Sequence, residues 1–331
     1  MSENNMFLSV RDIVVEYTQN KQVIHAVNGV SLELEKGKTL GLVGETGAGK
    51  TTVAKSILRI LPDNSARFVR GEVILGGENI TALEETRMLD IRGRRIAMIF
   101  QDPMTALNPL MSVGEQIMEV FSIHRDDLSK AECDEESARM LELVGIPRQR
   151  RFEYPHQFSG GMKQRVVIAM ALACDPELLL ADEPTTALDV TIQAQVLELI
   201  KDLQEKLNTS MILITHDLGV VAETCDSVAV MYAGKIVESG DKWPIFQNPS
   251  HPYTIGLFGS LPSMNIEQSR LTPIRGLPPD PSRLPEGCSF ARRCPKVTKS
   301  CIQNEIPLIE VEPNHLCRCL KLNEGGANNG E

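Results

Sequence analysis

The most constraining feature of the chain is the string Gly-Glu-Thr-Gly-Ala-Gly-Lys-Thr at residues 44–51. It follows a short apolar run at residues 39–43 and precedes apolar residues at helical spacing, among them Val53, Ala54 and Ile57. A glycine-rich loop between a strand and a helix aims backbone N–H groups at a phosphate. The sequence therefore predicts a phosphate-binding loop (P-loop). The alternative, a glycine-rich turn with a surface lysine, does not account for the flanking strand and helix.

Each residue of this loop, and the residue that follows it, is a candidate nucleotide contact. Lys50 is long enough to reach the β- and γ-phosphates, and the Thr51 hydroxyl is a suitable ligand for Mg²⁺. We therefore expect ATP and Mg²⁺ as ligands. The candidate contacts are Gly44, Glu45, Thr46, Gly47, Ala48, Gly49, Lys50, Thr51 and Thr52.

Two acidic residues, Asp182 and Glu183, follow the continuous apolar run at residues 178–181, and Pro184 then ends the strand. A carboxylate at this position can bind Mg²⁺ directly or through water. The neighbouring carboxylate can orient and deprotonate an attacking water molecule. Acids at a solvated strand end are the alternative, but that alternative is weak in a chain that also carries a P-loop.

A second candidate anion site is Ser159-Gly160-Gly161, which opens a predicted helix. A Ser hydroxyl and Gly amides at a helix N-terminus can bind a phosphate. One nucleotide rarely needs two such sites from one chain, so we expect this one to cover the γ-phosphate of ATP on a second subunit. The alternative is an N-cap with a flexible lead-in, and these three residue types are too common to decide alone.

Apolar patterning predicts an α/β fold, because strands alternate with helices as in a parallel sheet. A helical block inserted at about residues 103–172 interrupts the alternation, and we place the first domain at residues 1–240.

The amino-acid composition changes after Gly240, since 12 of the 19 prolines lie between Pro244 and Pro313. Residues 275–285 are too rich in proline for a helix or a central strand. Residues 241–331 therefore form a predicted loop-rich extension. The expected strands are 8–17, 27–34, 39–43, 96–100, 178–181 and 211–214, and a helix is expected at 192–207.

Charge and apolar content limit the possible locations and partners. The net charge of −10 argues against a nucleic-acid-binding protein. The N-terminus lacks the features of a signal peptide, and no apolar run approaches the ~20 residues that span a bilayer. We therefore expect a cytoplasmic chain that reaches the membrane only through a partner.

The cysteines are also unevenly distributed, because five of the eight lie between Cys288 and Cys319. Structural disulfides are rare in the cytoplasm. Four thiolates can hold Zn²⁺ or an iron–sulfur cluster, and the absence of a C-x₂-C spacing favours the cluster. Ordinary reduced cysteines are the alternative.

The order of these motifs, over roughly residues 6–240, resembles the ATPase subunits of ABC transporters. The resemblance implies a P-loop NTPase cassette with a RecA-like parallel sheet core, a β-subdomain and an inserted helical subdomain. Two departures leave the implied contacts intact: Met162 replaces the usual Gln after the signature glycines, and Thr51 replaces the commoner Ser. The implied roles are Tyr17 stacking on adenine, Gln101 sensing γ-phosphate and Mg²⁺, Ser159, Gly160 and Gly161 as the signature, Asp182 as a Mg²⁺ ligand, Glu183 as catalytic base, Ala187 to Asp189 as the D-loop, and His216 as the switch histidine.

Three further segments resemble the dipeptide and oligopeptide importer branch, which nickel importers share: residues 101–109, 154–162 and 251–254. The C-terminal cysteines resemble a motif of peptide-importer ATPases that binds a [4Fe–4S] cluster. Cys317 and Cys319 compete for the fourth ligand, and the spacing from His315 in the family motif favours Cys319. The implied cluster ligands are Cys288, Cys294, Cys301 and Cys319.

This resemblance implies a peripheral protein on the cytoplasmic face of the cell membrane. The implied partners are a second homologous ATPase subunit, two transmembrane permeases docked near residues 101–109, and an extracytoplasmic substrate-binding protein. Two alternatives remain, a nickel importer and a soluble ABC ATPase of DNA repair or translation. The transported substrate, pairing with an identical or a different ATPase subunit, and the role of the cluster stay open.

Overall fold

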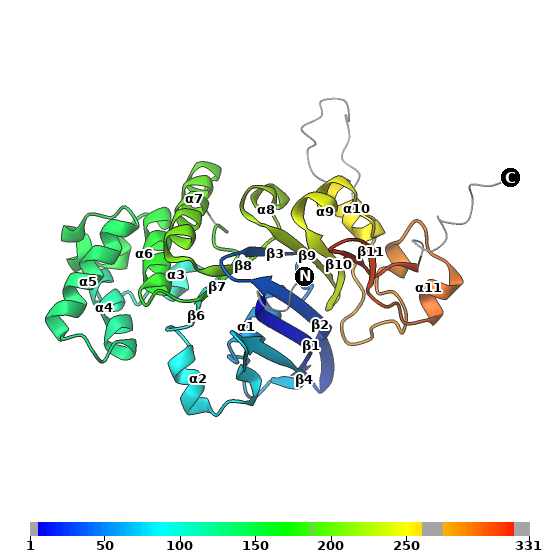
Figure 1. Ribbon diagram of the computed structural model, residues 1–331, viewed down its shortest axis with the longest axis horizontal. Coiled ribbons are helices and arrows are strands. Elements are labelled where there is room, and N and C mark those ends of the chain that lie inside the picture. The colour runs from blue at the N-terminus through cyan, green and yellow to red at the C-terminus, as the bar shows by residue number, and fades with distance from the viewer. Residues whose placement is uncertain (1–5, 187, 260–273, 321–331) are drawn as a thin grey trace. The chain divides into compact units, whose positions relative to one another are not determined.

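The computed structural model describes residues 6–186, 188–259 and 274–320 (Figure 1). It divides the chain into two compact units. The described residues of Met1–Phe7, Leu34–Thr39 and Glu78–Ile214 form the helical unit. Those of Leu8–Glu33, Leu40–Gly77 and Thr215–Glu331 form the P-loop unit. Among the described residues, no helix is long and apolar enough to cross a membrane.

Parallel strands form the sheet of the helical unit. β7 (Leu178–Asp182) lies between β6 (Ile96–Ile99) and β8 (Ser210–Thr215) and pairs in parallel with both. Every residue of β7 and β8 is buried, as expected of parallel strands covered on both faces. The strands predicted at these three places are confirmed.

Helices make up most of this unit, and their first residues carry clear start signals. α4 begins after Ser112 and α5 after Ser129, and each serine forms a capping box with a Glu three residues later. α7 ends at Asn208 in a left-handed conformation. The helical pattern predicted between residues 104 and 172 is confirmed. The elements are β5 (Glu78–Asn79), η2 (Ile80–Ala82), α2 (Glu85–Ile91), α3 (Pro103–Ala106), α4 (Val113–His124), α5 (Lys130–Leu143), η3 (Arg148–Phe152), η4 (Pro155–Gln157), α6 (Gly160–Leu172) and α7 (Val190–Leu207).

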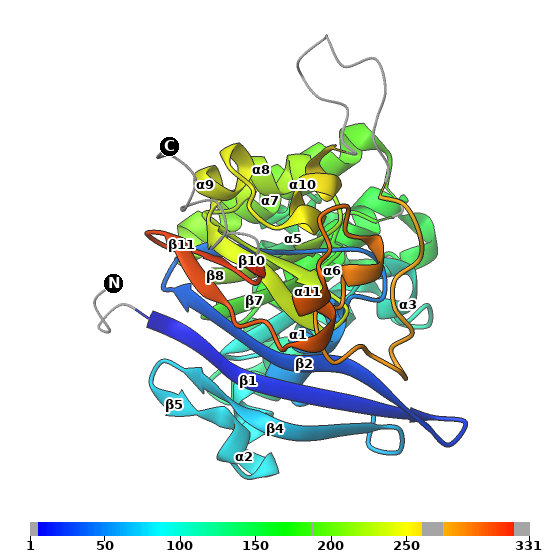
Figure 2. The same ribbon diagram turned by 90° about the vertical axis from the view of Figure 1, so that its right-hand side faces the viewer.

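Long strands form the first layer of the P-loop unit, in the order β2, β1, β4 (Figure 2). β1 (Met6–Gln19) and β2 (Gln22–Glu35) are joined at Asn20 and Lys21, which both have positive φ as a type I′ hairpin turn requires. β4 (Ala66–Leu75) pairs antiparallel with β1. The polar turn predicted at Asn20 and Lys21 is confirmed.

A second sheet of this unit carries the P-loop. β3 (Thr39–Val43) pairs in parallel with β9 (Ser227–Tyr232), which pairs antiparallel with β10 (Lys235–Asp241). All five residues of β3 are buried. The chain leaves β3 directly into the P-loop and then α1 (Lys50–Ile57), as predicted, while α8 (Leu218–Thr224) precedes β9.

The C-terminal extension shares this sheet, because β12 pairs antiparallel with β10. Glu238 of β10 is fully buried and accepts hydrogen bonds from the amides of Ser250 and His251, and its carboxylate lies 2.7 Å from Nε2 of His315. Residues 275–285 contain neither helix nor strand, as predicted. The extension elements are α9 (Lys242–Gln247), α10 (Pro252–Gly259), η5 (Ala291–Arg293), α11 (Lys299–Gln303), β11 (Ile309–Glu312) and β12 (His315–Cys317).

Candidate nucleotide site

Close backbone packing explains two glycines of the P-loop, Gly44 and Gly49. Gly49 is the N-cap of α1 with φ of 104°, and an added Cβ would lie 2.3 Å from the Ala26 carbonyl oxygen. A Cβ on Gly44 would lie 2.1 Å from the Met231 carbonyl oxygen. Only glycine fits at either position, so the loop amides keep their place at the N-terminus of α1.

We expect Gly49→Ala to destabilise the fold more than Gly47→Ala, and equilibrium denaturation of the two variants tests this. Gly47 also has positive φ, 81°, but an added Cβ there would meet no atom within 4 Å. Gly47→Ala should therefore cost only about 1–2 kcal/mol in free energy of unfolding, for the left-handed backbone. Gly49→Ala adds overpacking worth about 1–3 kcal/mol. Equal losses would contradict the packing explanation.

The Lys50 side chain is buried against the backbone of the P-loop. Lys50 is 7% exposed, and its ammonium donates to the carbonyl oxygens of Gly44 at 2.7 Å and Glu45 at 3.2 Å. The Tyr17 hydroxyl lies 3.4 Å from the Thr52 hydroxyl, so the aromatic ring stands beside the start of α1. The structure therefore brings Tyr17 to the P-loop, while its stacking on adenine stays a prediction.

Parallel pairing brings the polar residues of the helical unit together. Gln101 follows β6 and Glu183 follows β7, so both leave the same edge of the sheet. The Gln101 amide donates to Oε2 of Glu183 at 3.1 Å, and the Thr186 hydroxyl donates to the same oxygen at 2.8 Å. Asp182, the last residue of β7, is 3% exposed. The positive φ of Glu183, 46°, turns the chain out of the strand.

The signature residues open α6. Ser159 is its N-cap, and the hydroxyl accepts a hydrogen bond from the Met162 amide at 3.4 Å. A Cβ on Gly161 would lie 2.6 Å from the Ile192 side chain, so this glycine lets α6 approach α7. Ser159 and Gly160 are exposed. A role toward the nucleotide of a second subunit stays a prediction.

The remaining predicted residues lie on connections after strands. His216 is exposed between β8 and α8. Asp189, of the predicted D-loop, caps α7 by accepting from the Ile192 amide at 3.0 Å. Ala187 lies outside the described residues.

Two residues next to the P-loop were not predicted. The Tyr253 hydroxyl accepts a hydrogen bond from the Glu45 amide at 2.9 Å, and Arg293 forms an ion pair with the Glu45 carboxylate at 2.8 Å. Tyr253 lies in one of the segments that resemble the importer branch, but nothing local in the sequence connects it or Arg293 with the P-loop.

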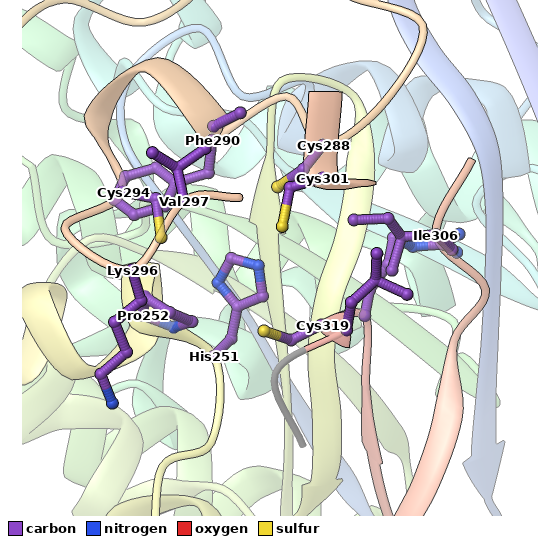
Figure 3. Close-up of a pocket in the computed structure, with 13 residues that line it drawn as sticks. His251, Pro252, Cys288, Phe290, Cys294, Lys296, Val297, Cys301, Ile306 and Cys319 are labelled. Carbon is purple, nitrogen blue, oxygen red and sulfur yellow. Dashed lines mark hydrogen bonds between the residues drawn. The ribbon is translucent and has the colours of Figure 1, made fainter. Parts of the chain in front are cut away.

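The predicted iron–sulfur extension is wrong. Over residues 6–186, 188–259 and 274–320, no three His, Cys, Asp or Glu side chains are grouped so that they could hold a metal ion. The four cysteines predicted as ligands do line one small cavity with His251; in Figure 3 the thiol of Cys294 lies on the opposite side of the His251 ring from the other three. Burial raises the pKa of Cys288 to about 11 and also raises that of Cys294, which disfavours the thiolates that a cluster needs. These four residues are Cys288, Cys294, Cys301 and Cys319, while Cys317 is buried in β12.

Comparison with known proteins gives two family matches and several long relatives. The family described as ABC transporter matches residues 27–186, and the one described as oligopeptide/dipeptide transporter, C-terminal region, matches residues 237–301. A dipeptide transport ATP-binding protein of Bacillus subtilis is 53% identical, covering 87% of this chain and 86% of that protein. An oligopeptide transport ATP-binding protein of Escherichia coli is 48% identical, covering 95% of this chain and 93% of that protein.

Solved structures extend the comparison to the fold. The dimeric structure of an ATP-binding cassette in a post-hydrolysis state, bound to ADP and Pi, is similar with a TM-score of 0.63 and 25% sequence identity. The match covers 71% of this chain and 98% of that chain.

Proposed function

Because the chain belongs to the ABC transporter ATP-binding proteins with an oligopeptide/dipeptide transporter C-terminal region, we propose that it powers the import of di- or oligopeptides by hydrolysing ATP. The observation that carries the proposal is the pairing of a P-loop on β3 with this type of C-terminal region in one chain. We assign residues 1–240 to the cassette, with a helical subdomain at about 103–172, and residues 241–331 to the extension.

ATP binding is assigned to the P-loop, with Tyr17 stacking on the adenine and residues 44–52 holding the phosphates. The oxygen donors of Thr51, Gln101 and Asp182 fit Mg²⁺, which prefers hard oxygen ligands. Asp182 in particular is a carboxylate only 3% exposed at a strand end. A bound Mg²⁺ would neutralise phosphate charge, and these three residues would hold it.

Hydrolysis is assigned to Glu183, His216 and Gln101. In this proposal the Glu183 carboxylate takes a proton from the attacking water, and the hydrogen bonds that Gln101 and Thr186 donate to its Oε2 hold the carboxylate in position. His216 contacts the γ-phosphate in this proposal. Ser159, Gly160 and Gly161 contact the ATP of a second ATPase subunit, so that two subunits close on two ATP molecules and reopen after hydrolysis.

The proposed assembly places this chain peripherally on the cytoplasmic face of the membrane, with a second homologous ATPase subunit and two permeases. An extracytoplasmic binding protein would deliver the peptide. Affinity purification from membranes, followed by transport assays with radiolabelled dipeptide and Ni²⁺, tests the proposal. Co-purified permeases and peptide uptake would support it. Nickel uptake without peptide uptake, or a chain without permease partners, would replace it with one of the alternatives.

The permease contact is assigned to residues 101–109 and the exposed apolar side chain directly after them. Leu110 is 85% exposed and directly follows residues 101–109, so we assign it to the same contact. We expect Leu110→Asp to abolish co-purification of the permeases, because a charge buried in the contact would lose its hydration. ATP affinity of the isolated subunit should not change.

Ile302→Asp is the matched control for this docking prediction, because Ile302 is a 55% exposed apolar residue of α11. Permeases should co-purify with this variant in normal amounts. Normal recovery of permeases with Leu110→Asp as well would remove residue 110 from the proposed contact.

A further inference from the structure

The C-terminal extension contacts the P-loop at Glu45. Its carboxylate accepts two hydrogen bonds from Arg293, from Nη1 to Oε2 at 2.8 Å and from Nη2 to Oε1 at 3.0 Å. The two residues are 248 positions apart in the chain. The Arg293 side chain is 6% exposed and that of Glu45 is 27% exposed. A largely buried, two-point ion pair of this kind fixes both orientation and charge.

Arg293 is also held by two residues of the extension and by Tyr232 of β9. Nε donates to the carbonyl oxygen of Arg275 at 3.1 Å, and Nη1 donates to the Tyr232 hydroxyl at 3.2 Å. The guanidinium carbon lies 5.8 Å from the centre of the Phe290 ring. Since these contacts fix the Arg293 guanidinium, Arg293 determines the position of the Glu45 carboxylate.

The backbone amide and carbonyl oxygen of Glu45 also form hydrogen bonds. Its amide donates to the Tyr253 hydroxyl at 2.9 Å, and its carbonyl oxygen accepts from the Lys50 ammonium at 3.2 Å and from the Ala48 amide at 3.1 Å. Tyr253 is fully buried against Tyr232, with ring centres 4.6 Å apart. Burial raises the pKa of Tyr253, so its phenol stays neutral. Glu45 thus connects the extension with the lysine of the P-loop.

The charge of Glu45 affects how strongly the P-loop attracts the phosphates of ATP. The triphosphate of ATP is strongly anionic, and an unpaired carboxylate inside the loop that binds it would repel it. Arg293 neutralises that carboxylate and directs it toward the extension. The same contacts hold the Glu45 carbonyl oxygen where Lys50 donates to it.

We propose that Arg293 is a positioning residue for ATP, acting through Glu45, so that the extension completes the nucleotide site of the cassette. Tyr253 acts with it by holding the Glu45 amide. This proposal rests on the proposed binding of ATP at the P-loop and adds a residue from outside the motifs that define that site.

Calorimetric titration of the full chain with Mg–ATP tests the proposal. Arg293→Met should raise the dissociation constant about tenfold, because it exposes the phosphates to the Glu45 charge. In a Glu45→Gln background, Arg293→Met should change the dissociation constant less than twofold, because no carboxylate is left to neutralise. The ratio of the Arg293→Met and wild-type constants should fall as NaCl is raised, since salt screens the repulsion.

Arg292→Met is the control, because Arg292 is the exposed neighbour of Arg293 in η5 and should bind ATP normally. A purely structural brace predicts a different pattern, in which Arg293→Met weakens ATP binding equally in both backgrounds and at every salt concentration. That pattern, or unchanged affinity in Arg293→Met, would overturn the inference. A wild-type chain that failed to bind ATP would instead overturn the proposed function on which the inference rests.

Discussion

Glu183→Gln is expected to slow ATP hydrolysis by about 10²–10⁴-fold, which is the usual contribution of a general base and corresponds to roughly 3–5 kcal/mol. The amide cannot accept the proton of the attacking water. It can still accept hydrogen bonds from Gln101 and Thr186 at the place where the Oε2 atom of Glu183 accepts them. Binding of ATP and Mg²⁺ should therefore survive, and the assembled transporter should be trapped with ATP bound.

ATP turnover of the assembled transporter and ATP affinity of the isolated subunit are the two measurements for Glu183→Gln. Glu205→Gln is the control, because Glu205 is an exposed residue near the end of α7. That variant should hydrolyse ATP at the normal rate. A Glu183→Gln transporter with near-normal turnover would remove Glu183 from the role of catalytic base.

Lys50→Ala and Ser159→Arg are expected to separate two halves of the proposed composite site. Lys50→Ala should weaken ATP binding to the isolated subunit by about 10–100-fold, since hydrogen bonds to a charged group are worth about 1.5–3 kcal/mol. Ser159→Arg should leave that affinity unchanged and abolish hydrolysis by the assembled transporter. The reason is that Ser159 is assigned to the γ-phosphate bound by the other subunit, where a long charged side chain would block closure.

Ser159→Ala is the control for helix capping, because the Ser159 hydroxyl accepts a hydrogen bond from the Met162 amide. Losing that cap costs about 1 kcal/mol of stability, and thermal unfolding should report a similar loss for both Ser159 variants. Only Ser159→Arg, and not Ser159→Ala, should prevent the two ATPase subunits from closing and so abolish hydrolysis. If Ser159→Arg weakened ATP binding to the isolated subunit as much as Lys50→Ala does, the signature would act within its own chain.

Local patterns correctly predicted the strand and helix on either side of residues 44–51 and the strand before the acidic pair, because each lies on a few consecutive residues. The strand before residues 44–51 and the strand that ends at Asp182 are buried as their mainly apolar composition indicates, since a parallel strand covered on both faces carries mostly apolar side chains. The hydrogen bond between Gln101 and Glu183 was not predicted from the sequence. It depends on β6 and β7 being neighbours in the sheet.

The prediction of a cluster on the four cysteines failed because spacing along the chain reports local structure only. Spacing along the chain shows which donors are available, but a metal site needs those donors to converge on one point. The fold decides that convergence, and the described residues contain no group of donors that could hold a metal ion. The burial that raises the pKa of Cys288 is likewise a property of the packed extension and not of its sequence.

The sequence by itself therefore determined the strand, glycine-rich loop and helix around residues 44–51 and the apolar strand before the acidic pair, because these depend on near neighbours in the chain. The alternation of strand-like and helical segments indicated the α/β class. Only the tertiary structure decided what surrounds them. It pairs β12 with β10 and places Arg293 on Glu45, 248 positions away. Such contacts form because the burial of apolar side chains packs distant segments together, and the polar groups brought inside must then find partners.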